Sequence, residues 1–141
     1  MVRAGRPALL FVTVCTHERK PVLSNPLVHG LLSECWRTSA HWRVGRYVVM
    51  PDHIHLFCSP TSGQRTLARW VQYWKSVVSL RWPRPAEQPI WQPSFWDTQV
   101  RGHESYSRKW DYVRLNPVRR GLVETPDAWP YAGEIDVLDW P

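Results

Sequence analysis

Two strand-forming runs stand on either side of the dipeptide Pro51-Asp52, and this arrangement constrains the fold more than any other feature. Residues 42–50 and 53–59 are short and rich in β-branched and aromatic side chains, which is typical of strands. Proline followed by aspartate favours a turn, and so short a connection joins neighbouring antiparallel strands. The sequence therefore predicts a β-hairpin in an antiparallel sheet.

Strand and helix patterns alternate on both sides of this hairpin. Before it, residues 8–16 have the composition of a strand, and residues 26–41 carry apolar side chains at helical spacing. After it, residues 63–82 predict the clearest helix of the chain. Its apolar stripe consists of Leu67, Trp70, Val71, Trp74, Val77 and Val78. A proline-interrupted fourth strand is predicted over residues 90–101 and a last helix over residues 104–115.

The order of these elements is β-α-β-β-α-β, followed by one more helix. It predicts the α+β class and a ferredoxin-like (RRM-like) antiparallel sheet. The first two helices should cover one face and leave the other face free, and an additional C-terminal helix follows the sheet elements. Residues 1–123 are expected to form the main domain, and residues 124–141 an acidic appendage packed on it.

Charge is distributed unevenly along the chain, whose formal net charge is +6. Up to Arg120 there are 18 basic and seven acidic residues, a net charge of +11, whereas the last 21 residues carry five acids and no lysine or arginine. A basic domain with ten tryptophans suggests a polyanionic partner, with nucleic acid first. The alternative is that arginine only solubilises the surface and tryptophan only fills the core.

Composition excludes several other classes of protein. With 43% hydrophobic and 21% charged residues, the chain is not disordered. It has no apolar run of about 18 residues, so no contact with a membrane is predicted. Its three cysteines are scattered and include no CxxC pair, which argues against a disulfide framework or a structural zinc site and indicates a cytoplasmic protein.

Two histidines begin the second arm of the hairpin. Because side chains alternate along a strand, His53 and His55 should point to the same face, about 7 Å apart, while Ile54, Leu56 and Cys58 point beneath the helices. Two imidazoles on the free face could hold a divalent metal. By itself, however, the pair also fits two polar residues on a solvated strand.

A second polar pair stands in the last predicted helix. Tyr112 and Asn116 are four residues apart and would share a helix face, with Cβ atoms about 6 Å apart. A phenol and an amide beside a metal could attack and position a phosphodiester. Alone, the pair also fits a core tyrosine and an asparagine that caps the helix before Pro117.

Taken together, the two segments resemble a known family. The run MPDHIHL (residues 50–56), followed later by DYVRLNPVRRGLV (111–123), is similar to the single-tyrosine HUH transposases (transposase IS200-like). WQPSFWD (91–97) and DAWPY (127–131) resemble the REP-associated tyrosine transposase branch. The family often has asparagine where this chain has Asp52, a neighbour of the histidines to which the resemblance assigns no catalytic role.

The resemblance implies a role for each residue of the two motifs. His53 and His55, with Asn116, would bind Mg²⁺ or Mn²⁺, and Tyr112 on the catalytic C-terminal helix would be the nucleophile. A tyrosine phenol is mostly protonated at neutral pH, so it needs the metal or nearby cations to react. The implied activity is cleavage and rejoining of single-stranded or hairpin DNA, at short palindromic repeats, through a 5′-phosphotyrosine intermediate.

Clustered basic residues are the predicted DNA contacts. They are Arg65, Arg69 and Lys75 on one face of the 63–82 helix, and Arg114, Arg119 and Arg120 around the second motif. The candidates for stacking on unpaired bases are Trp91, Trp96 and Trp110. The protein is expected to act as a monomer or homodimer in the bacterial cytoplasm, associated with the nucleoid.

Two other functions stay open at this point. One is a non-catalytic, domesticated nucleic-acid-binding module of the same fold, and the other is a metal-dependent phosphoesterase that hydrolyses a small substrate without a covalent step. The acidic segment 124–141 is expected to lie near the DNA-binding surface and to weaken non-specific binding. Deleting it should then raise affinity for random single strands, unless the deletion prevents folding.

Overall fold

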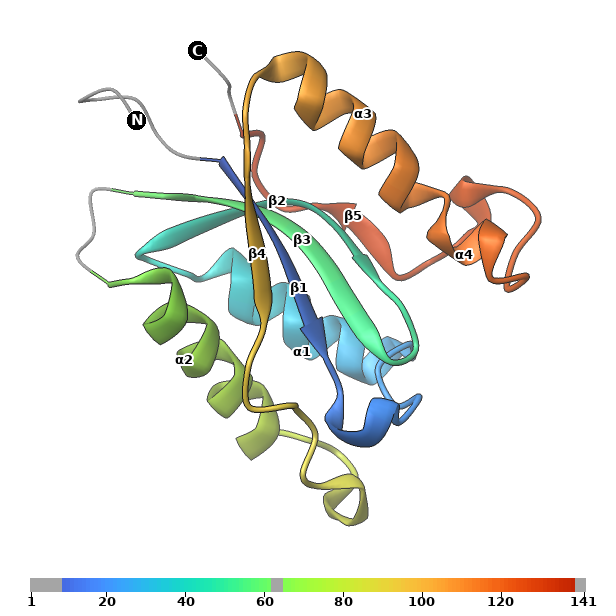
Figure 1. Ribbon diagram of the computed structural model, residues 1–141. Coiled ribbons are helices and arrows are strands. Elements are labelled where there is room, and N and C mark those ends of the chain that lie inside the picture. The colour runs from blue at the N-terminus through green and yellow to red at the C-terminus, as the bar shows by residue number, and fades with distance from the viewer. Residues whose placement is uncertain (1–8, 62–64, 139–141) are drawn as a thin grey trace.

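The structure is a computed structural model that describes residues 9–61 and 65–138 (Figure 1). The strands are β1 (Leu9–Cys15), β2 (Trp42–Val49), β3 (His53–Pro60), β4 (Trp96–Val100) and β5 (Ala132–Glu134). The helices are α1 (Pro26–Arg37), α2 (Leu67–Leu80), α3 (His103–Arg114) and the single turn α4 (Asn116–Arg119). Short 3-10 turns occupy His17–Arg19, Pro85–Glu87 and Pro126–Ala128.

The strands form one antiparallel sheet in the order β4-β1-β3-β2-β5. β2 and β3 make the predicted hairpin, and its turn is closed by the Met50 N–H, which donates to the His53 carbonyl oxygen at 2.8 Å. β1 pairs with β3, so β3 lies at the centre of the sheet. The α+β class and the ferredoxin-like antiparallel sheet are thus confirmed.

The main hydrophobic core lies between the sheet and the helices α1 and α2. Ile54, Leu56 and Cys58 are fully buried there, as the alternation along β3 predicts. Five tryptophans that are at most 6% exposed also belong to this core: Trp36, Trp42, Trp70, Trp74 and Trp82. Much of the unusual tryptophan content is therefore packing.

Both long helices of this layer begin at a side-chain cap. The Asn25 side chain accepts a hydrogen bond from the Val28 N–H at the start of α1, and Thr66 accepts one from the Arg69 N–H at the start of α2. α1 ends at Arg37, earlier than the predicted residue 41. The predicted α2 start at residue 63 lies outside the described residues. No helix in the described ranges is long and apolar enough to cross a membrane.

The fourth strand is shorter than predicted, and the expected span of 90–101 is wrong in its first half. Pro89 and Pro93 have no N–H to donate, so the segment around them cannot continue the ladder. It attaches to the end of β1 through an isolated bridge, in which the Gln92 N–H donates to the Cys15 carbonyl oxygen at 3.0 Å.

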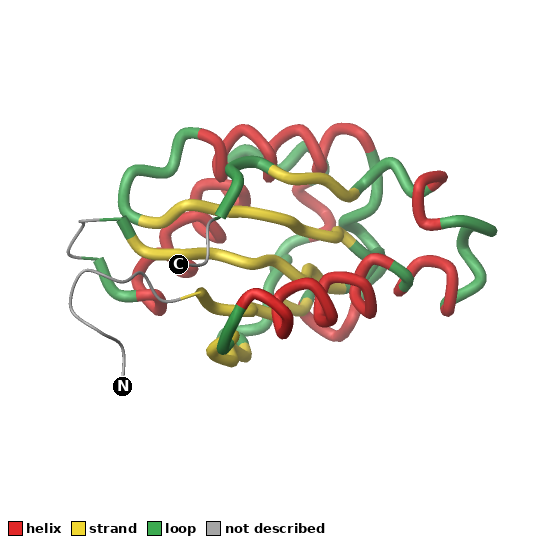
Figure 2. Tube along the Cα trace, turned by 90° about the horizontal axis from the view of Figure 1, so that it is seen from above, coloured by secondary structure: helices red, strands yellow, loops and turns green. Residues whose placement is uncertain are grey.

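The second face of the sheet is not free, which corrects the prediction. α3 crosses it, so the sheet lies between α3 on one side and α1 and α2 on the other (Figures 1 and 2). Tyr106 of α3 packs against Phe57, with ring centroids 4.7 Å apart, and Val113 packs against Val48 and Met50. An otherwise polar helix is therefore fixed to the sheet by a few apolar side chains.

The acidic C-terminal segment extends the sheet and contributes to a hydrophobic cluster. β5 pairs with the outer edge of β2, and Leu138 is 6% exposed in a cluster with Leu9, Phe57 and Tyr106. The Trp129 indole N–H donates to the Val49 carbonyl oxygen at 3.0 Å. The segment therefore contributes to the sheet and to a hydrophobic cluster and is not only a surface appendage.

Candidate active site

The two histidines of β3 lie together on the face that α3 crosses. Occupying the first and third positions of the strand, His53 and His55 point the same way, with ring centroids 4.7 Å apart and planes at 75°. His55 stacks on Phe11 of β1, and Phe11 and Trp110 of α3 pack against the same buried cluster. The predicted convergence of the two imidazoles is therefore present in the fold.

Asp52 holds the first imidazole in place. Its Oδ1 lies 2.8 Å from His53 Nδ1, and its Oδ2 accepts a hydrogen bond from Arg19 Nε at 3.0 Å. Arg120 lies 3.9 Å from the same carboxylate. Burial alone would raise the pKa of Asp52, but the hydrogen bond with His53 and the neighbouring positive charges hold that pKa below its ordinary value. The carboxylate therefore fixes the ring orientation and leaves Nε2 directed outward.

The second imidazole is held by a threonine on the neighbouring strand. Thr13 Oγ1 lies 2.9 Å from His55 Nδ1. Burial lowers the pKa of His55 to about 3, with further contributions from His53 and nearby lysine and arginine side chains. Burial also lowers the pKa of His53, although Asp52 opposes the shift. Both rings are thus neutral at physiological pH, the form that binds metals.

The second motif reaches the histidines through its asparagine. Asn116 Nδ2 lies 3.5 Å from His53 Nε2, where a short helix begins. α3 ends at Arg114, so Tyr112 and Asn116 do not share one continuous helix as predicted. Tyr112 is 66% exposed on the last turn of α3, and the guanidinium of Arg119 lies 3.9 Å from the centre of its ring. The structure therefore brings Asn116 to His53 and leaves the tyrosine exposed to solvent, with Arg119 on its ring.

The donor set fits an open metal site. Each imidazole is fixed at Nδ1 by a neighbouring oxygen, a pattern that orients metal-binding histidines. Within residues 9–61 and 65–138, no group of three or more histidine, cysteine or acidic side chains gathers as a closed metal cage would require. Two imidazoles and one amide could hold an ion and leave positions for water or substrate oxygens.

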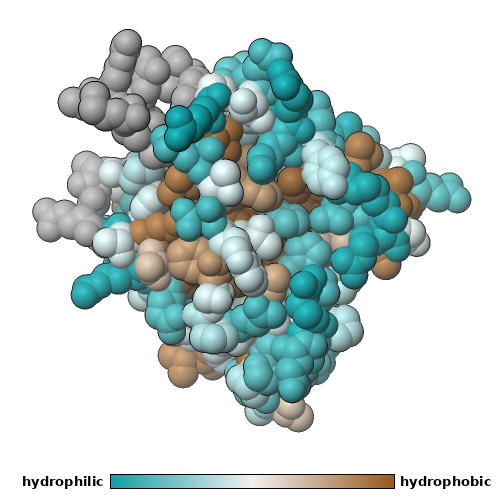
Figure 3. All heavy atoms as spheres, in the orientation of Figure 1, coloured by the Kyte–Doolittle hydropathy of each residue, from teal (hydrophilic) through white to brown (hydrophobic). Residues whose placement is uncertain are grey.

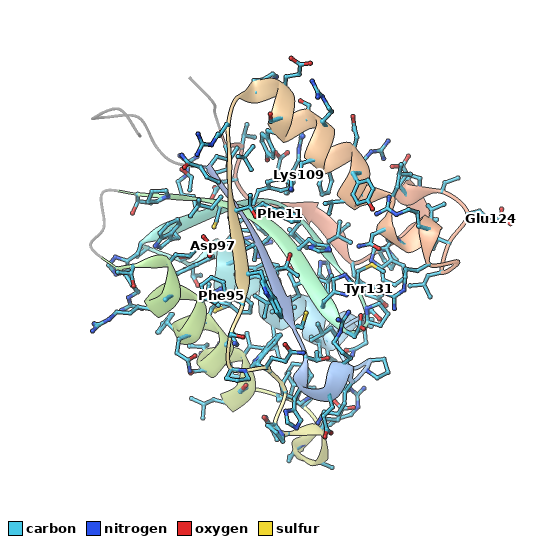
Figure 4. All side chains as sticks on the ribbon, in the orientation of Figure 1. Phe11, Phe95, Asp97, Lys109, Glu124 and Tyr131 are labelled. Carbon is cyan, nitrogen blue, oxygen red and sulfur yellow. The ribbon has the colours of Figure 1, made fainter. Side chains whose placement is uncertain are left out.

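Positive charges surround the pair from three elements. Lys109, Arg119 and Arg19 all lower the pKa of His55, which places their charges close to it. In Figure 4, Lys109 of α3 lies above Phe11, and its Nζ is 4.8 Å from the centre of that ring. The sequence patterns did not single out Lys109, although its position three residues before Tyr112 puts it on the same helix face. They did not single out Arg19 either, for which the sequence has no signal.

The other predicted DNA contacts are divided between the two sides of the sheet. Arg119 and Arg120 lie at the histidine site, and Arg114 lies close to Asp111, at 3.7 Å. Arg65 and Arg69 lie at the start of α2 on the opposite face. The expectation that Lys75 belongs to an exposed basic face is wrong. Lys75 is only 4% exposed, and its buried ammonium group donates a hydrogen bond to the Gln92 carbonyl oxygen at 2.7 Å.

The three tryptophans considered for base stacking differ in exposure. Trp91 packs on the main core and donates to the Lys75 carbonyl oxygen at 3.1 Å. Trp110 packs against Phe57 beneath α3. Trp96 on β4 is 57% exposed. Of the three, only Trp96 presents most of its ring to solvent.

This combination of fold and site defines a class of protein. It consists of a ferredoxin-like sheet, a His-X-His pair on the central strand and a tyrosine on the helix that crosses that face. Residues 10–110 match the family described as "Transposase IS200 like". The chain belongs to this family of DNA-transposing enzymes. The matched range contains both histidines and ends just before Tyr112.

Individual relatives agree with this assignment. The chain is 26% identical to a Haemophilus influenzae protein assigned to the REP-associated tyrosine transposases, over 94% of this chain and 86% of the relative. It is 28% identical to the REP-associated tyrosine transposase of Escherichia coli, over 64% of this chain and 53% of the relative. A solved REP-associated tyrosine transposase, bound to a REP hairpin, has the same fold, with a TM-score of 0.74 at 23% identity over 90% of this chain and 76% of that one.

Proposed function

We propose that this protein cuts and rejoins single strands of DNA through Tyr112, at hairpins formed by short palindromic repeats. The observation that carries the proposal is the convergence of His53, His55 and Asn116 on the face that the tyrosine-bearing helix crosses. The hairpin substrate is supported by the structural relative, which was solved bound to a REP hairpin.

The proposed chemistry conserves phosphodiester bonds. The phenolate oxygen of Tyr112 attacks the phosphorus of a DNA phosphodiester, the bond to the 3′ oxygen breaks, and the leaving oxygen takes up a proton to become a 3′-hydroxyl. The 5′-phosphate stays on Tyr112 until another 3′-hydroxyl attacks it, loses its proton and releases the tyrosine. Because each bond broken is replaced by an equivalent one, rejoining needs no external source of energy.

The proposal includes Mg²⁺ or Mn²⁺ held by His53, His55 and Asn116. When bound, the ion would polarise the phosphate oxygens and stabilise the charge that develops on them. The protein's own contribution is to keep both imidazoles neutral and oriented, through Asp52 and Thr13. The surrounding lysine and arginine side chains would bind the flanking phosphates.

Replacing Asp52 with alanine should weaken Mn²⁺ binding about 10- to 100-fold, because His53 loses the group that orients it. Isothermal titration with Mn²⁺ in the absence of DNA measures this effect directly. Asp52→Asn keeps an oxygen that can accept from Nδ1 and should retain most of the affinity. Asp97→Asn, an exposed carboxylate on β4, is the control and should change nothing. Undiminished Mn²⁺ binding by Asp52→Ala would contradict the proposed role.

Replacing His55 with alanine should slow DNA cleavage about 10²- to 10⁴-fold, because the variant loses stabilisation of the charge that develops in the transition state. Hairpin binding should persist. The substrate is a hairpin oligonucleotide with unpaired flanks, copied from palindromic repeats of the source genome and incubated with Mg²⁺ or Mn²⁺. Labels at the two DNA ends show which fragment stays on the protein. His103→Ala, an exposed histidine of α3, should retain full activity.

Two outcomes would contradict the proposal. Full cleavage by His55→Ala would separate the histidine pair from the reaction. Hairpin binding without any cleavage by the unmodified chain, under either metal, would instead indicate a non-catalytic nucleic-acid-binding module.

A further inference from the structure

The strand register places one exposed tryptophan on the same face as the histidines. Thr13 of β1 stands opposite His55 on one side and Trp96 of β4 on the other. Directly opposed residues of an antiparallel sheet point to the same face. Because Thr13 contacts His55 on the active-site face, Trp96 lies there as well. Its neighbour Phe95 points the other way and packs on the main core, as the alternation requires (Figure 4).

Trp96 lies on β4, an edge strand of the sheet, and is exposed. Two strand spacings of about 4.8 Å put its backbone roughly 10 Å from that of His55. Between them, Phe11 and Thr13 are half-buried. Figure 3 shows hydrophobic side chains interspersed with hydrophilic ones around β4 and β1. Thr13, which contacts His55, and Phe11, which stacks on it, therefore lie on the strand between the histidines and this edge strand.

Packing does not account for the position of this indole. Among the described tryptophans, Trp96 alone has more than half of its side chain exposed, whereas the buried ones have clear roles in the core. A cation also lies over the neighbouring strand, since the Lys109 ammonium lies 4.8 Å from the Phe11 ring. Flat aromatic rings beside positive charge are the elements with which proteins bind single-stranded nucleic acid.

We propose that Trp96 stacks on an unpaired base close to the phosphate that is cut, and that Lys109 binds the backbone between them. This inference rests on the proposed function and names a residue that positions its substrate. Stacking is tolerant of base identity, so Trp96 would fix where the strand lies rather than which base it carries. Loss of the indole should therefore weaken binding at one nucleotide position.

The test uses the same hairpin oligonucleotide with a single abasic site placed at each unpaired position in turn. Affinities are measured by fluorescence anisotropy in the presence of EDTA, so that no cleavage occurs. For the unmodified chain, one abasic position should weaken binding about 5- to 150-fold. Trp96→Thr keeps a strand-forming residue in β4. This variant should bind the intact hairpin more weakly than the unmodified chain does, by the same factor. The abasic site at that position should then cause no further loss of affinity.

Two further variants complete the experiment. Trp96→Phe should restore part of the affinity and part of the abasic penalty, which a purely structural role would not produce. Tyr73→Ala removes a comparable exposed ring, 52% exposed, from the opposite side of the sheet and should change neither. Two results would overturn this proposal while the unmodified chain still forms its covalent adduct. One is that Trp96→Thr binds the intact hairpin as tightly as the unmodified chain; the other is that the abasic site still weakens binding by Trp96→Thr. A chain that neither binds hairpins nor forms an adduct would overturn the proposed function and this inference together.

Discussion

Replacing Tyr112 with phenylalanine should eliminate the covalent protein–DNA adduct, with no detectable residual product, while hairpin binding stays unchanged. The variant removes a single oxygen from a side chain that is 66% exposed, so neither the core nor the histidine pair is disturbed. If water attacked the phosphate in place of the tyrosine, no covalent protein–DNA product would form. Denaturing electrophoresis of labelled hairpin incubated with Mn²⁺ separates the adduct from free DNA.

The surroundings of the other tyrosines favour Tyr112 as the nucleophile. Tyr47 and Tyr106 are 4% and 5% exposed and belong to hydrophobic clusters. Tyr73 is exposed, but it lies on α2, on the side of the sheet away from the histidines. Tyr131 is half-buried between Trp129 and another ring. An adduct that persists in Tyr112→Phe should therefore map to Tyr73 first, and would contradict the assignment.

The Tyr112→Phe variant also distinguishes the proposed reaction from simple hydrolysis, and Arg119 is the cation next to this tyrosine. Its guanidinium lies 3.9 Å from the centre of the Tyr112 ring and donates to the Tyr112 carbonyl oxygen at 2.7 Å. The cation therefore packs on the ring that carries the proposed nucleophile. Turnover of the hairpin by Tyr112→Phe at the unmodified rate, without any adduct, would mean that water attacks directly and that the protein is a hydrolytic phosphoesterase.

The histidine pair and its face could be predicted because they depend on local rules. A turn at Pro51-Asp52 and strict alternation along one strand are enough to put His53 and His55 together, opposite a buried apolar row. The element order then gives the antiparallel sheet. These features need no knowledge of distant contacts.

The parts that could not be predicted depend on contacts between distant segments. Lys75 has the helical position of a surface residue, but the carbonyl of Gln92 comes from a later loop and satisfies it in the interior. α3 crosses the second sheet face through Tyr106, Trp110 and Val113, a stripe too sparse to indicate burial by itself. Arg19 reaches Asp52 from a 3-10 turn whose backbone the sequence does not indicate.

The acidic C-terminal segment was expected to act through its charge, and the structure also gives it a structural role. Leu138 packs against β2 where a side chain on Gly45 would not fit, because a Cβ there would lie 2.7 Å from the leucine Cδ1. The Tyr131 carbonyl oxygen accepts a hydrogen bond from the Val49 N–H at 2.7 Å, next to the β5 ladder. Glu134 lies 3.5 Å from Arg46, which partly neutralises its charge.

Deleting residues 124–141 should therefore prevent folding rather than raise the affinity for random single strands. Leu138→Ala alone should lower the free energy of unfolding by about 2–5 kcal/mol, measured by urea denaturation. The full deletion adds the loss of Trp129 and an edge strand to a domain whose total stability is expected to be about 5–15 kcal/mol. Val137→Ala, at a side chain that is 65% exposed, is the control and should change stability by no more than about 0.5 kcal/mol.

Charge and structure can be separated within the same segment. Neutralising the exposed Glu124 and Asp127 as Gln and Asn leaves β5 and Leu138 in place, so the thermal unfolding midpoint should not change. Affinity for a thymidine oligonucleotide should still rise at low salt, and the gain should disappear at high salt, because two negative charges no longer repel the phosphates. If the deletion variant folds and binds DNA like this double variant, the segment acts through its charge alone. If the double variant binds DNA with unchanged affinity, the contribution of the segment is structural.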